Sequence, residues 1–164
     1  MNNSISLIGM AGAGKSSIGK KLAKHLEFHF VDSDLLIEEK YGKSLQDILN
    51  QNGNKKFKEI EENSLLSVEF NQIVLATGGS AVFCNSAMKH IKENSTVIYL
   101  EVTYEDISAR ISNFSERGLI KRPDQTIQEA YKEREGLYQH FADHIVQNNG
   151  KIESCLNKIL TLIN

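Results

Sequence analysis

The stretch Gly9-Met10-Ala11-Gly12-Ala13-Gly14-Lys15-Ser16 decides the fold, because it matches the pattern G-x-x-x-x-G-K-[ST] of a phosphate-binding loop, or P-loop. Before it, Ser4-Ile5-Ser6-Leu7-Ile8 predicts a buried strand. After it, residues 15–26 place apolar side chains on one face of a predicted helix. A glycine-rich turn between a strand and a helix is the setting in which this pattern binds phosphate, so a plain turn that binds nothing is disfavoured.

Each residue type in the loop meets a physical demand of phosphate binding. Glycines allow torsions that side chains forbid, so consecutive N–H groups can point inward as an anion nest. The helix adds its positive N-terminal end, Lys15 can reach the β- and γ-phosphates, and the Ser16 hydroxyl can ligate Mg²⁺. The sequence therefore predicts a site for a nucleoside triphosphate with Mg²⁺. The residues expected to hold the phosphates are Gly12, Ala13, Gly14, Lys15, Ser16 and Ser17.

Length and composition predict one compact domain over residues 1–164. The chain is 40% hydrophobic and 24% charged, which is typical of globular proteins, and its formal net charge is −2. This charge gives no bulk attraction to nucleic acid or to an anionic membrane, and we expect neither as a partner. We find no signal peptide or transmembrane pattern. Cys84 and Cys155 lack disulfide-framework or zinc spacing, so we expect a cytoplasmic protein with reduced thiols, and a monomer.

Apolar segments alternate with helical patterns, which predicts an α/β fold with a parallel sheet and helices on both faces. The expected strands are 5–8, 28–31, 73–76, 97–101 and 144–147. The expected helices are 15–26, 34–41, 45–52, 54–67, 86–91, 104–111, 127–141 and 152–163.

Residues 112–124 break this alternation. The segment is polar, contains Gly118 and Pro123, and carries the basic residues Arg117, Lys121 and Arg122. A solvated loop is the default interpretation. In a nucleotide enzyme, an exposed basic loop late in the chain is also where a closing lid is expected.

Two carboxylates follow the second predicted strand, in Asp32-Ser33-Asp34. Ligands of open α/β sheets bind beyond the carboxyl ends of the strands, so both side chains should face the site. Asp32 could hold Mg²⁺ directly or through water, and Asp34 could take a proton from an attacking hydroxyl. The alternative is that Asp34 only caps the helix that follows, since Asp is a favoured N-cap.

Three further features could belong to an acceptor site. Gly78 and Gly79 follow the third strand, where their N–H groups could bind substrate hydroxyls or simply make a tight turn. Lys58 lies among mixed charges on a predicted helix, and Arg134 lies in Lys132-Glu133-Arg134-Glu135. Charge patterns of these kinds usually mark solvated helix faces.

Taken together, these features resemble the shikimate kinase family of small P-loop kinases with the nucleoside-monophosphate-kinase fold. The likeness runs from Leu7 to about Val146. Its specific part is the ordered set Asp32-Ser33-Asp34-Leu35-Leu36-Ile37, Phe57-Lys58-Glu59-Ile60-Glu61, Ala76-Thr77-Gly78-Gly79, Arg122-Pro123 and Arg134-Glu135-Gly136-Leu137-Tyr138. The resemblance implies a three-layer sandwich around a five-stranded parallel sheet of order 2-3-1-4-5. It also implies ATP as donor, the 3-hydroxyl of shikimate as acceptor, and a role in aromatic amino acid biosynthesis.

The resemblance also assigns roles by position. Lys15 would bind phosphate, Ser16 would ligate Mg²⁺, and Asp32 would support the metal. Asp34 would hold the acceptor hydroxyl and act as its base, and Arg122 would be the lid arginine on the transferring phosphate. The acceptor would be lined by Gly78, Gly79 and Ser80, with its carboxylate on Arg134 and Lys58. Arg110 would lie against adenine.

The chain departs from the family pattern on the acceptor side and in the lid. Lys58 stands where the family has an arginine, Ser80 replaces the third of three glycines, and Asp124-Gln125 replaces apolar residues after Arg122-Pro123. Lysine lacks the planar fork with which arginine grips a carboxylate. One alternative function is therefore a related kinase for another small hydroxylated acid or polyol. A second alternative is a nucleotide-binding regulator without catalysis, although a pure binder has no need of Asp34.

Overall fold

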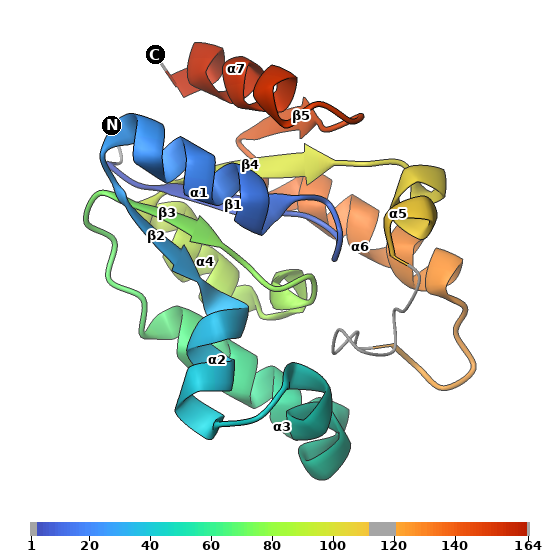
Figure 1. Cartoon of the computed structure of the whole chain (residues 1–164). Helices are drawn as coiled ribbons and strands as arrows, with labels where there is room; N and C mark the ends of the chain where they lie inside the picture. Colours follow the sequence, from blue (N-terminus) through green and yellow to red (C-terminus); the bar gives the residue numbers. More distant parts are fainter. Residues whose placement is uncertain (1–2, 112–120, 164) are drawn as a thin grey trace.

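Five strands of the computed structural model, which describes residues 3–111 and 121–163, form one parallel sheet in the order β2-β3-β1-β4-β5 (Figure 1). The strands are β1 (Ile5–Ile8), β2 (His29–Asp32), β3 (Ile73–Ala76), β4 (Thr96–Glu101) and β5 (His144–Gln147). The predicted five-stranded parallel sheet and its order are thus confirmed. Because all strands run the same way, the carboxyl ends of the central strands meet at one edge, where ligands of such sheets bind.

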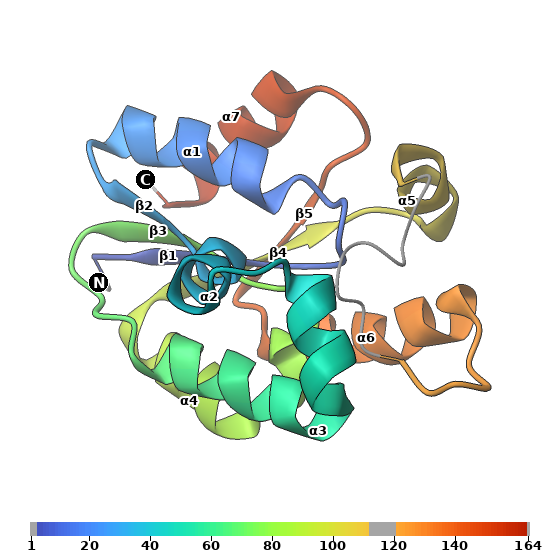
Figure 2. The ribbon, with the colours of Figure 1, turned by 60° about the horizontal axis from the view of Figure 1, so that its bottom comes forward.

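Helices cover both faces of this sheet and make a three-layer sandwich (Figures 1 and 2). α1 and α7 pack side by side on one face, and α3, α4 and α6 lie on the other. The helices are α1 (Lys15–Leu26), α2 (Ser33–Tyr41), α3 (Leu45–Leu66), α4 (Asn85–Asn94), α5 (Tyr104–Arg110), α6 (Ile127–Phe141) and α7 (Ile152–Ile163), with the short 3₁₀ helix η1 (Ala81–Phe83). Within the described ranges, none of them is long and apolar enough to cross a membrane.

The differences from the predicted elements are small and have local causes. β2 begins and ends one residue later than expected, and α4 extends to Asn94 instead of ending at Ile91. The two helices expected at 45–52 and 54–67 are the halves of α3, which is interrupted at Gly53 by a left-handed φ of 74°. The predicted lid falls mostly on residues 112–120, which lie outside the described residues.

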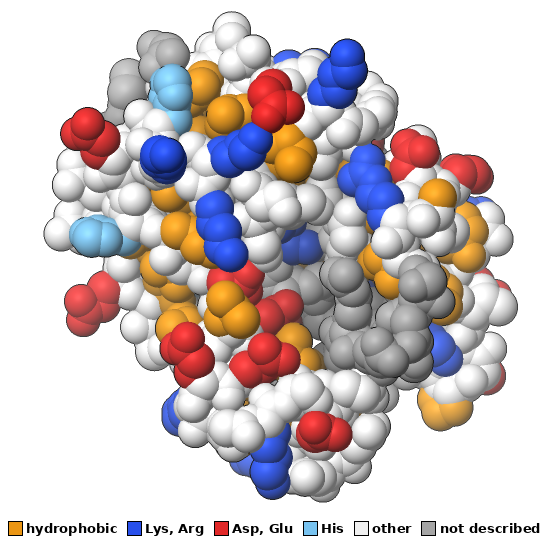
Figure 3. Space-filling view, in the orientation of Figure 1, with side chains coloured by type: hydrophobic (Ala, Val, Ile, Leu, Met, Phe, Trp, Pro, Cys, Tyr) orange, Lys and Arg blue, Asp and Glu red, His pale blue; other side chains and the backbone are white. Residues whose placement is uncertain are grey.

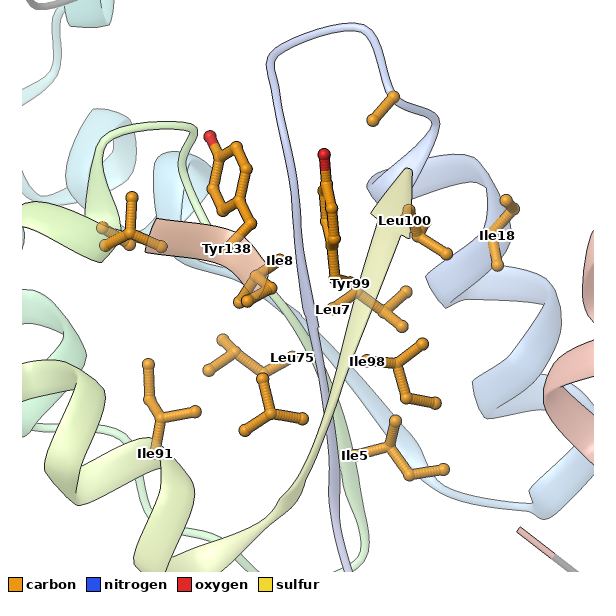
Figure 4. Close-up of a cluster of buried hydrophobic side chains, with 14 of the residues drawn as sticks. Ile5, Leu7, Ile8, Ile18, Leu75, Ile91, Ile98, Tyr99, Leu100 and Tyr138 are labelled. Atoms are coloured by element: carbon orange, nitrogen blue, oxygen red, sulfur yellow. The ribbon is translucent and has the colours of Figure 1, made fainter. Parts of the chain in front are cut away.

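The main core is formed where the central strands meet α1, α4 and α6 (Figure 4). Leu7 and Ile98 lie on neighbouring strands and are both fully buried. Tyr138 of α6 stacks on Tyr99 of β4 with ring centroids 5.0 Å apart, which fixes α6 against the sheet. A second, smaller cluster joins α2 to α3 through Ile37, Leu45, Ile48, Leu49, Phe57 and Ile60. This cluster holds the α2–α3 pair as a unit beside the carboxyl edge of the sheet.

Candidate active site

A cavity of about 470 Å³ opens at the carboxyl edge of the sheet. Figure 3 shows this side of the molecule hollowed between the sheet and the α2–α3 pair, with acidic and basic side chains around the hollow. Most of the residues predicted for a site line this one cavity. These are Gly12, Gly14, Lys15, Ser16, Ser17, Asp32, Asp34, Gly79, Ser80 and Arg110.

The P-loop adopts the strand–loop–helix arrangement that its sequence predicts. Gly14 is the N-cap of α1 with φ 94°, and a Cβ there would lie 2.8 Å from Asn148 Nδ2, so only glycine fits without strain. Lys15 is 8% exposed, and its Nζ donates hydrogen bonds to the carbonyl oxygens of Gly9 (2.7 Å) and Met10 (2.9 Å). The ammonium group is therefore already held against the loop in which a phosphate would sit.

Asn148, just after β5, tethers the P-loop from the other end of the chain. This buried side chain donates from Nδ2 to the Ala13 carbonyl oxygen at 2.8 Å. The backbone carbonyl oxygen of Asn148 accepts from Arg110 Nη2 at 2.7 Å, while Arg110 Nη1 donates to the Gly12 carbonyl oxygen at 3.4 Å. Arg110 thus lies at the rim of the loop. Sequence reasoning missed Asn148, because a single Asn in Gln147-Asn148-Asn149-Gly150 looks like an ordinary turn.

Ser16 and Asp32 meet beside the loop. Ser16 Oγ donates to Asp32 Oδ2 at 2.6 Å. The other carboxylate oxygen of Asp32 accepts from the backbone N–H groups of Asp34 (3.0 Å) and Leu35 (3.4 Å), so Asp32 is the N-cap of α2. The alternative interpretation of Asp34 as that cap is therefore wrong. The side chain of Asp34 takes no part in this N-terminal cap, and it lines the cavity.

The Asp34 carboxyl lies in a desolvated position. Its pKa is raised to about 6, mainly because burial disfavours the charged form, with further contributions from the charges of Asp32 and Glu38. Lys15 opposes this shift. A carboxyl with such a pKa is ionised at neutral pH yet basic enough to accept a proton from a hydroxyl.

Gly78 lies directly against this carboxyl, and a larger residue there would displace the carboxyl groups beside it. A Cβ at Gly78 would be 2.6 Å from Asp34 Oδ1 and 2.5 Å from Glu61 Oε1. The backbone N–H of Gly78 donates to Ser33 Oγ at 3.0 Å, which fixes the turn. The glycine thus lets two carboxyl groups approach the main chain, and a side chain there would shift both of them.

Glu61 is the second of these carboxyl groups, and the sequence analysis did not select it. Glu61 is 2% exposed, and its Oε2 has no hydrogen-bond partner among the described residues. Its pKa is raised to about 8, first by burial and then by the charge of Asp34, while Arg134, Lys58 and Lys15 lower it. The mixed-charge pattern of α3 hid this residue, because burial of a single glutamate leaves no mark on such a pattern.

Arg134 is fully buried, so the alternative that it lies on a solvated helix face is wrong. Its Nη1 donates to the Ala130 carbonyl at 3.0 Å, and its Nη2 donates to Ser80 Oγ at 3.1 Å. Burial lowers the pKa of its guanidinium. Ser80 lines the cavity, so Arg134 lies immediately behind the cavity wall. Lys58 is half-buried and its Nζ faces the ring of Phe83 in η1, a residue that sequence reasoning also missed.

The predicted residues that do not line the cavity are Ala13, Lys58, Gly78, Arg122 and Arg134. Arg122 is the most exposed of them. Its side chain is 65% exposed, with Nη1 at 3.9 Å from Glu133 Oε2. The backbone next to it is held by the buried Gln125, whose Oε1 accepts from the Arg122 N–H at 3.2 Å and whose Nε2 donates to Glu133 Oε2 at 2.7 Å. Gln125, one of the departures from the family pattern, thus orders the described end of the predicted lid.

Removing the buried charge of Glu61 should stabilise the ligand-free protein at alkaline pH. Because its pKa is higher in the fold than in the unfolded chain, wild-type stability should fall as pH rises from about 4.5 through about 8. Glu61→Gln should abolish this loss, with a gain of roughly 2–3 kcal/mol in the free energy of unfolding at pH 9 and little at pH 5. The measurement is the free energy of unfolding in urea at pH 5 and pH 9, for the wild type and Glu61→Gln. Glu59→Gln, on the same helix and paired with Lys56, is the control and should give no gain at pH 9. A Glu61→Gln effect independent of pH would contradict the assigned cause.

The chain is similar in sequence and fold to proteins of one family. A family model described as shikimate kinase matches residues 11–164. A shikimate kinase from Francisella tularensis subsp. novicida is 38% identical over 164 residues, covering 97% of this chain and 93% of its own.

Two solved structures are also similar to this chain. A shikimate kinase from Acinetobacter baumannii, in complex with shikimate, aligns with a TM-score of 0.87 and 32% identity, over 98% of this chain and 92% of its own. A shikimate kinase from Aquifex aeolicus aligns with a TM-score of 0.85 and 28% identity, over 98% of this chain and 95% of its own. The likeness therefore extends over nearly the full length of each protein.

Proposed function

Because the chain belongs to the shikimate kinase family, whose reaction is the ATP-dependent phosphorylation of a shikimate hydroxyl, we propose that the cavity binds both substrates of this reaction. The nucleotide lies on the P-loop side and the acceptor lies between Asp34, Gly79 and Ser80. The observation that carries the proposal is that the desolvated carboxyl of Asp34 and the ammonium of Lys15 line one cavity. A base for a hydroxyl and a cation for phosphate are what phosphoryl transfer requires.

On the nucleotide side, the P-loop amides and Lys15 bind the phosphates of ATP. Lys15 has only to exchange the carbonyl oxygens of Gly9 and Met10 for phosphate oxygens. Arg110 sits at the rim through its bonds to Gly12 and Asn148, and we assign it to the adenine. A planar guanidinium stacks well on an aromatic base.

Ser16 and Asp32 form the proposed Mg²⁺ site. The hydroxyl and carboxylate oxygens lie 2.6 Å apart beside the phosphate loop, and oxygen ligands of this kind suit Mg²⁺. When bound there, Mg²⁺ would neutralise charge on the phosphates of ATP. Asp32 then has two tasks, since it also caps α2 and so orients the first turn that carries Asp34.

On the acceptor side, Asp34 orients the shikimate hydroxyl and accepts its proton. The hydroxyl oxygen forms a bond to the γ-phosphorus as the bond between that phosphorus and the leaving oxygen of ADP breaks. Arg134 and Lys58 supply positive charge for the shikimate carboxylate. Arg134 lies behind Ser80 and donates a hydrogen bond to its Oγ. Arg122 is assigned to the transferring phosphoryl group, which requires its exposed side chain to leave Glu133 and turn towards the cavity.

ADP release from the purified protein tests this proposal. ATP and Mg²⁺ are supplied with shikimate, with quinate or gluconate, or with no acceptor. Fast ADP release that depends on shikimate is expected. Preference for another hydroxy acid would instead favour the alternative of a related kinase, which the departures at Lys58 and Ser80 motivate. No acceptor-dependent release would point to a nucleotide-binding regulator.

Lys58→Arg should lower the KM for shikimate about three- to tenfold, because a guanidinium grips a carboxylate with two parallel hydrogen bonds. Ser80→Gly should act in the same direction, since Ser80 Oγ accepts a hydrogen bond from Arg134 that a carboxylate could take instead. The measurement is kcat/KM for shikimate in the wild type, both single variants and the double variant. Unchanged values in all of them would remove both residues from the acceptor site.

We also infer one kinase domain over residues 1–164 that works as a cytoplasmic monomer. The two cysteines, Cys84 and Cys155, are buried and unpaired with each other, which suits a reducing compartment. Size-exclusion chromatography with light scattering tests the monomer.

A further inference from the structure

Two cations of the acceptor side lie over one aromatic ring. Lys58 Nζ is 5.0 Å from the centroid of the Phe83 ring, and Arg134 Cζ is 4.8 Å from the same centroid. The two charges come from α3 and α6, which are far apart in sequence, and the ring comes from η1 between them. Both distances fall within the range in which the negative face of a ring attracts a cation.

The ring is held in place by the chain around it. Its neighbours Ala81 and Val82 are buried, and the Cys84 N–H closes the 3₁₀ turn on the Ala81 carbonyl at 3.0 Å. Cys84 Sγ also lies 3.8 Å from the Lys58 carbonyl oxygen, so η1 and α3 contact each other at this point. Phe83 can thus orient the lysine side chain relative to a fixed backbone.

Such a support matters more for lysine than for arginine. The ammonium group sits on a flexible four-carbon stem and has no planar fork to set its direction. Without a support, its conformational entropy would be lost on binding an acceptor carboxylate, which weakens binding. A ring that already holds the ammonium removes part of this loss. The same ring attracts both cations and so offsets their mutual repulsion.

We propose that Phe83 is a positioning residue for acceptor specificity, whose ring holds Lys58 and Arg134 as a pair facing the carboxylate of the acceptor. This inference rests on the proposed function, because it takes Lys58 and Arg134 to be the carboxylate-binding pair. Phe83 itself touches no reacting atom. The Phe83 ring therefore affects the binding of the acceptor and does not affect the rate of the chemical step.

Steady-state kinetics with saturating ATP and Mg²⁺ test the proposal. Phe83→Leu should raise the KM for shikimate about five- to tenfold, while kcat and the KM for ATP stay within about twofold. Phe83→Tyr keeps a ring face and should restore the KM to within about twofold of wild type. Phe30→Leu is the matched control, because it removes another half-buried ring beside a lysine, Lys20, outside the cavity. It should leave the KM for shikimate unchanged.

A double-variant cycle with Lys58→Met separates support of the cation from a general loss of packing. If the ring acts through Lys58, the factor by which Phe83→Leu raises the KM should be at least three times smaller in the Lys58→Met background than in the wild-type background. Equal effects in both backgrounds, or no rescue by Phe83→Tyr, would overturn the inference. The inference would also be overturned if Lys58→Met raises the KM for shikimate while Phe83→Leu leaves it normal. That result would leave the proposed function standing. If Lys58→Met itself leaves the KM unchanged, the assignment of the acceptor site is wrong, and the inference is wrong with it.

Discussion

Lys15→Ala is expected to lower kcat about a thousandfold while the protein stays folded. The ammonium of Lys15 is held within the phosphate loop by two carbonyl oxygens, so it faces the position where negative charge is rearranged during transfer. A preorganised cation in a site of low exposure stabilises the transition state far more than one in water. The measurement is kcat for shikimate-dependent ADP release, with circular dichroism to follow the fold.

Lys21→Ala is the matched control on the same helix. Lys21 forms an exposed ion pair with Glu153 at 2.6 Å, and pairs of this kind contribute little to stability. The kcat of Lys21→Ala should equal that of the wild type. A Lys15→Ala variant that keeps kcat within tenfold of the wild type would disprove the assignment of the P-loop lysine to catalysis.

Asp34→Asn is expected to lower kcat about a hundred- to ten-thousandfold, which is the range for loss of a positioned general base. The KM for ATP should change little, because the phosphates are held by the P-loop and Lys15. The wild-type kcat/KM for shikimate should also fall about tenfold per pH unit below pH 6. This follows because the pKa of Asp34 is raised to about 6 and only its ionised form can accept a proton. The residual activity of Asp34→Asn should lack this acid limb.

Asp32→Asn separates the two aspartates. Since Asp32 hydrogen-bonds to Ser16, Asp32→Asn should weaken Mg²⁺-dependent ATP binding, while the Asn side-chain oxygen can still cap α2. Asp32→Ala removes the cap as well and should cost about 1 kcal/mol of stability. Asp34→Asn should raise the free energy of unfolding of the ligand-free protein at neutral pH, because it removes a buried charge whose pKa is raised to about 6, and Asp34 takes no part in the cap. An Asp34→Asn variant with normal kcat and lower stability would reverse these roles.

The parts of this protein that could be predicted from sequence are those whose signal is local. The P-loop, its strand and its helix are specified by eight consecutive residues and their neighbours, and the structure places them as expected. Except for Ala13, the residues named for the nucleotide side also line one cavity. Asp34 lines this cavity as expected, but the hydrogen bonds of Asp32 were needed to exclude Asp34 as the helix cap.

The remaining parts depend on contacts between distant segments. Glu61 and Arg134 lie in helices whose charge pattern is typical of solvated faces, yet both are buried. Glu61 lies against Gly78, which follows β3, and Arg134 lies against Ser80 and the Phe83 ring. Phe83 looks like an ordinary apolar residue until its ring is seen beneath two cations. Asn148 belongs to no sequence motif that would have indicated its contact with the P-loop. A periodicity describes one helix or strand, and it has no information about which distant polar group that element will meet.

The tether from Asn148 to Ala13 has a consequence for how the protein is made. The ribosome makes the P-loop before the strands on either side of β1, which come from residues 73–76 and 96–101, and Asn148 follows Ala13 by 135 residues. A nascent chain that ends before Asn148 lacks this support for its nucleotide loop. Since a ligand stabilises only the state that binds it, ATP should protect chains folded through Asn148 and give truncated chains little defence against proteolysis. Nucleotide binding should thus distinguish chains that contain Asn148 from chains that end before it.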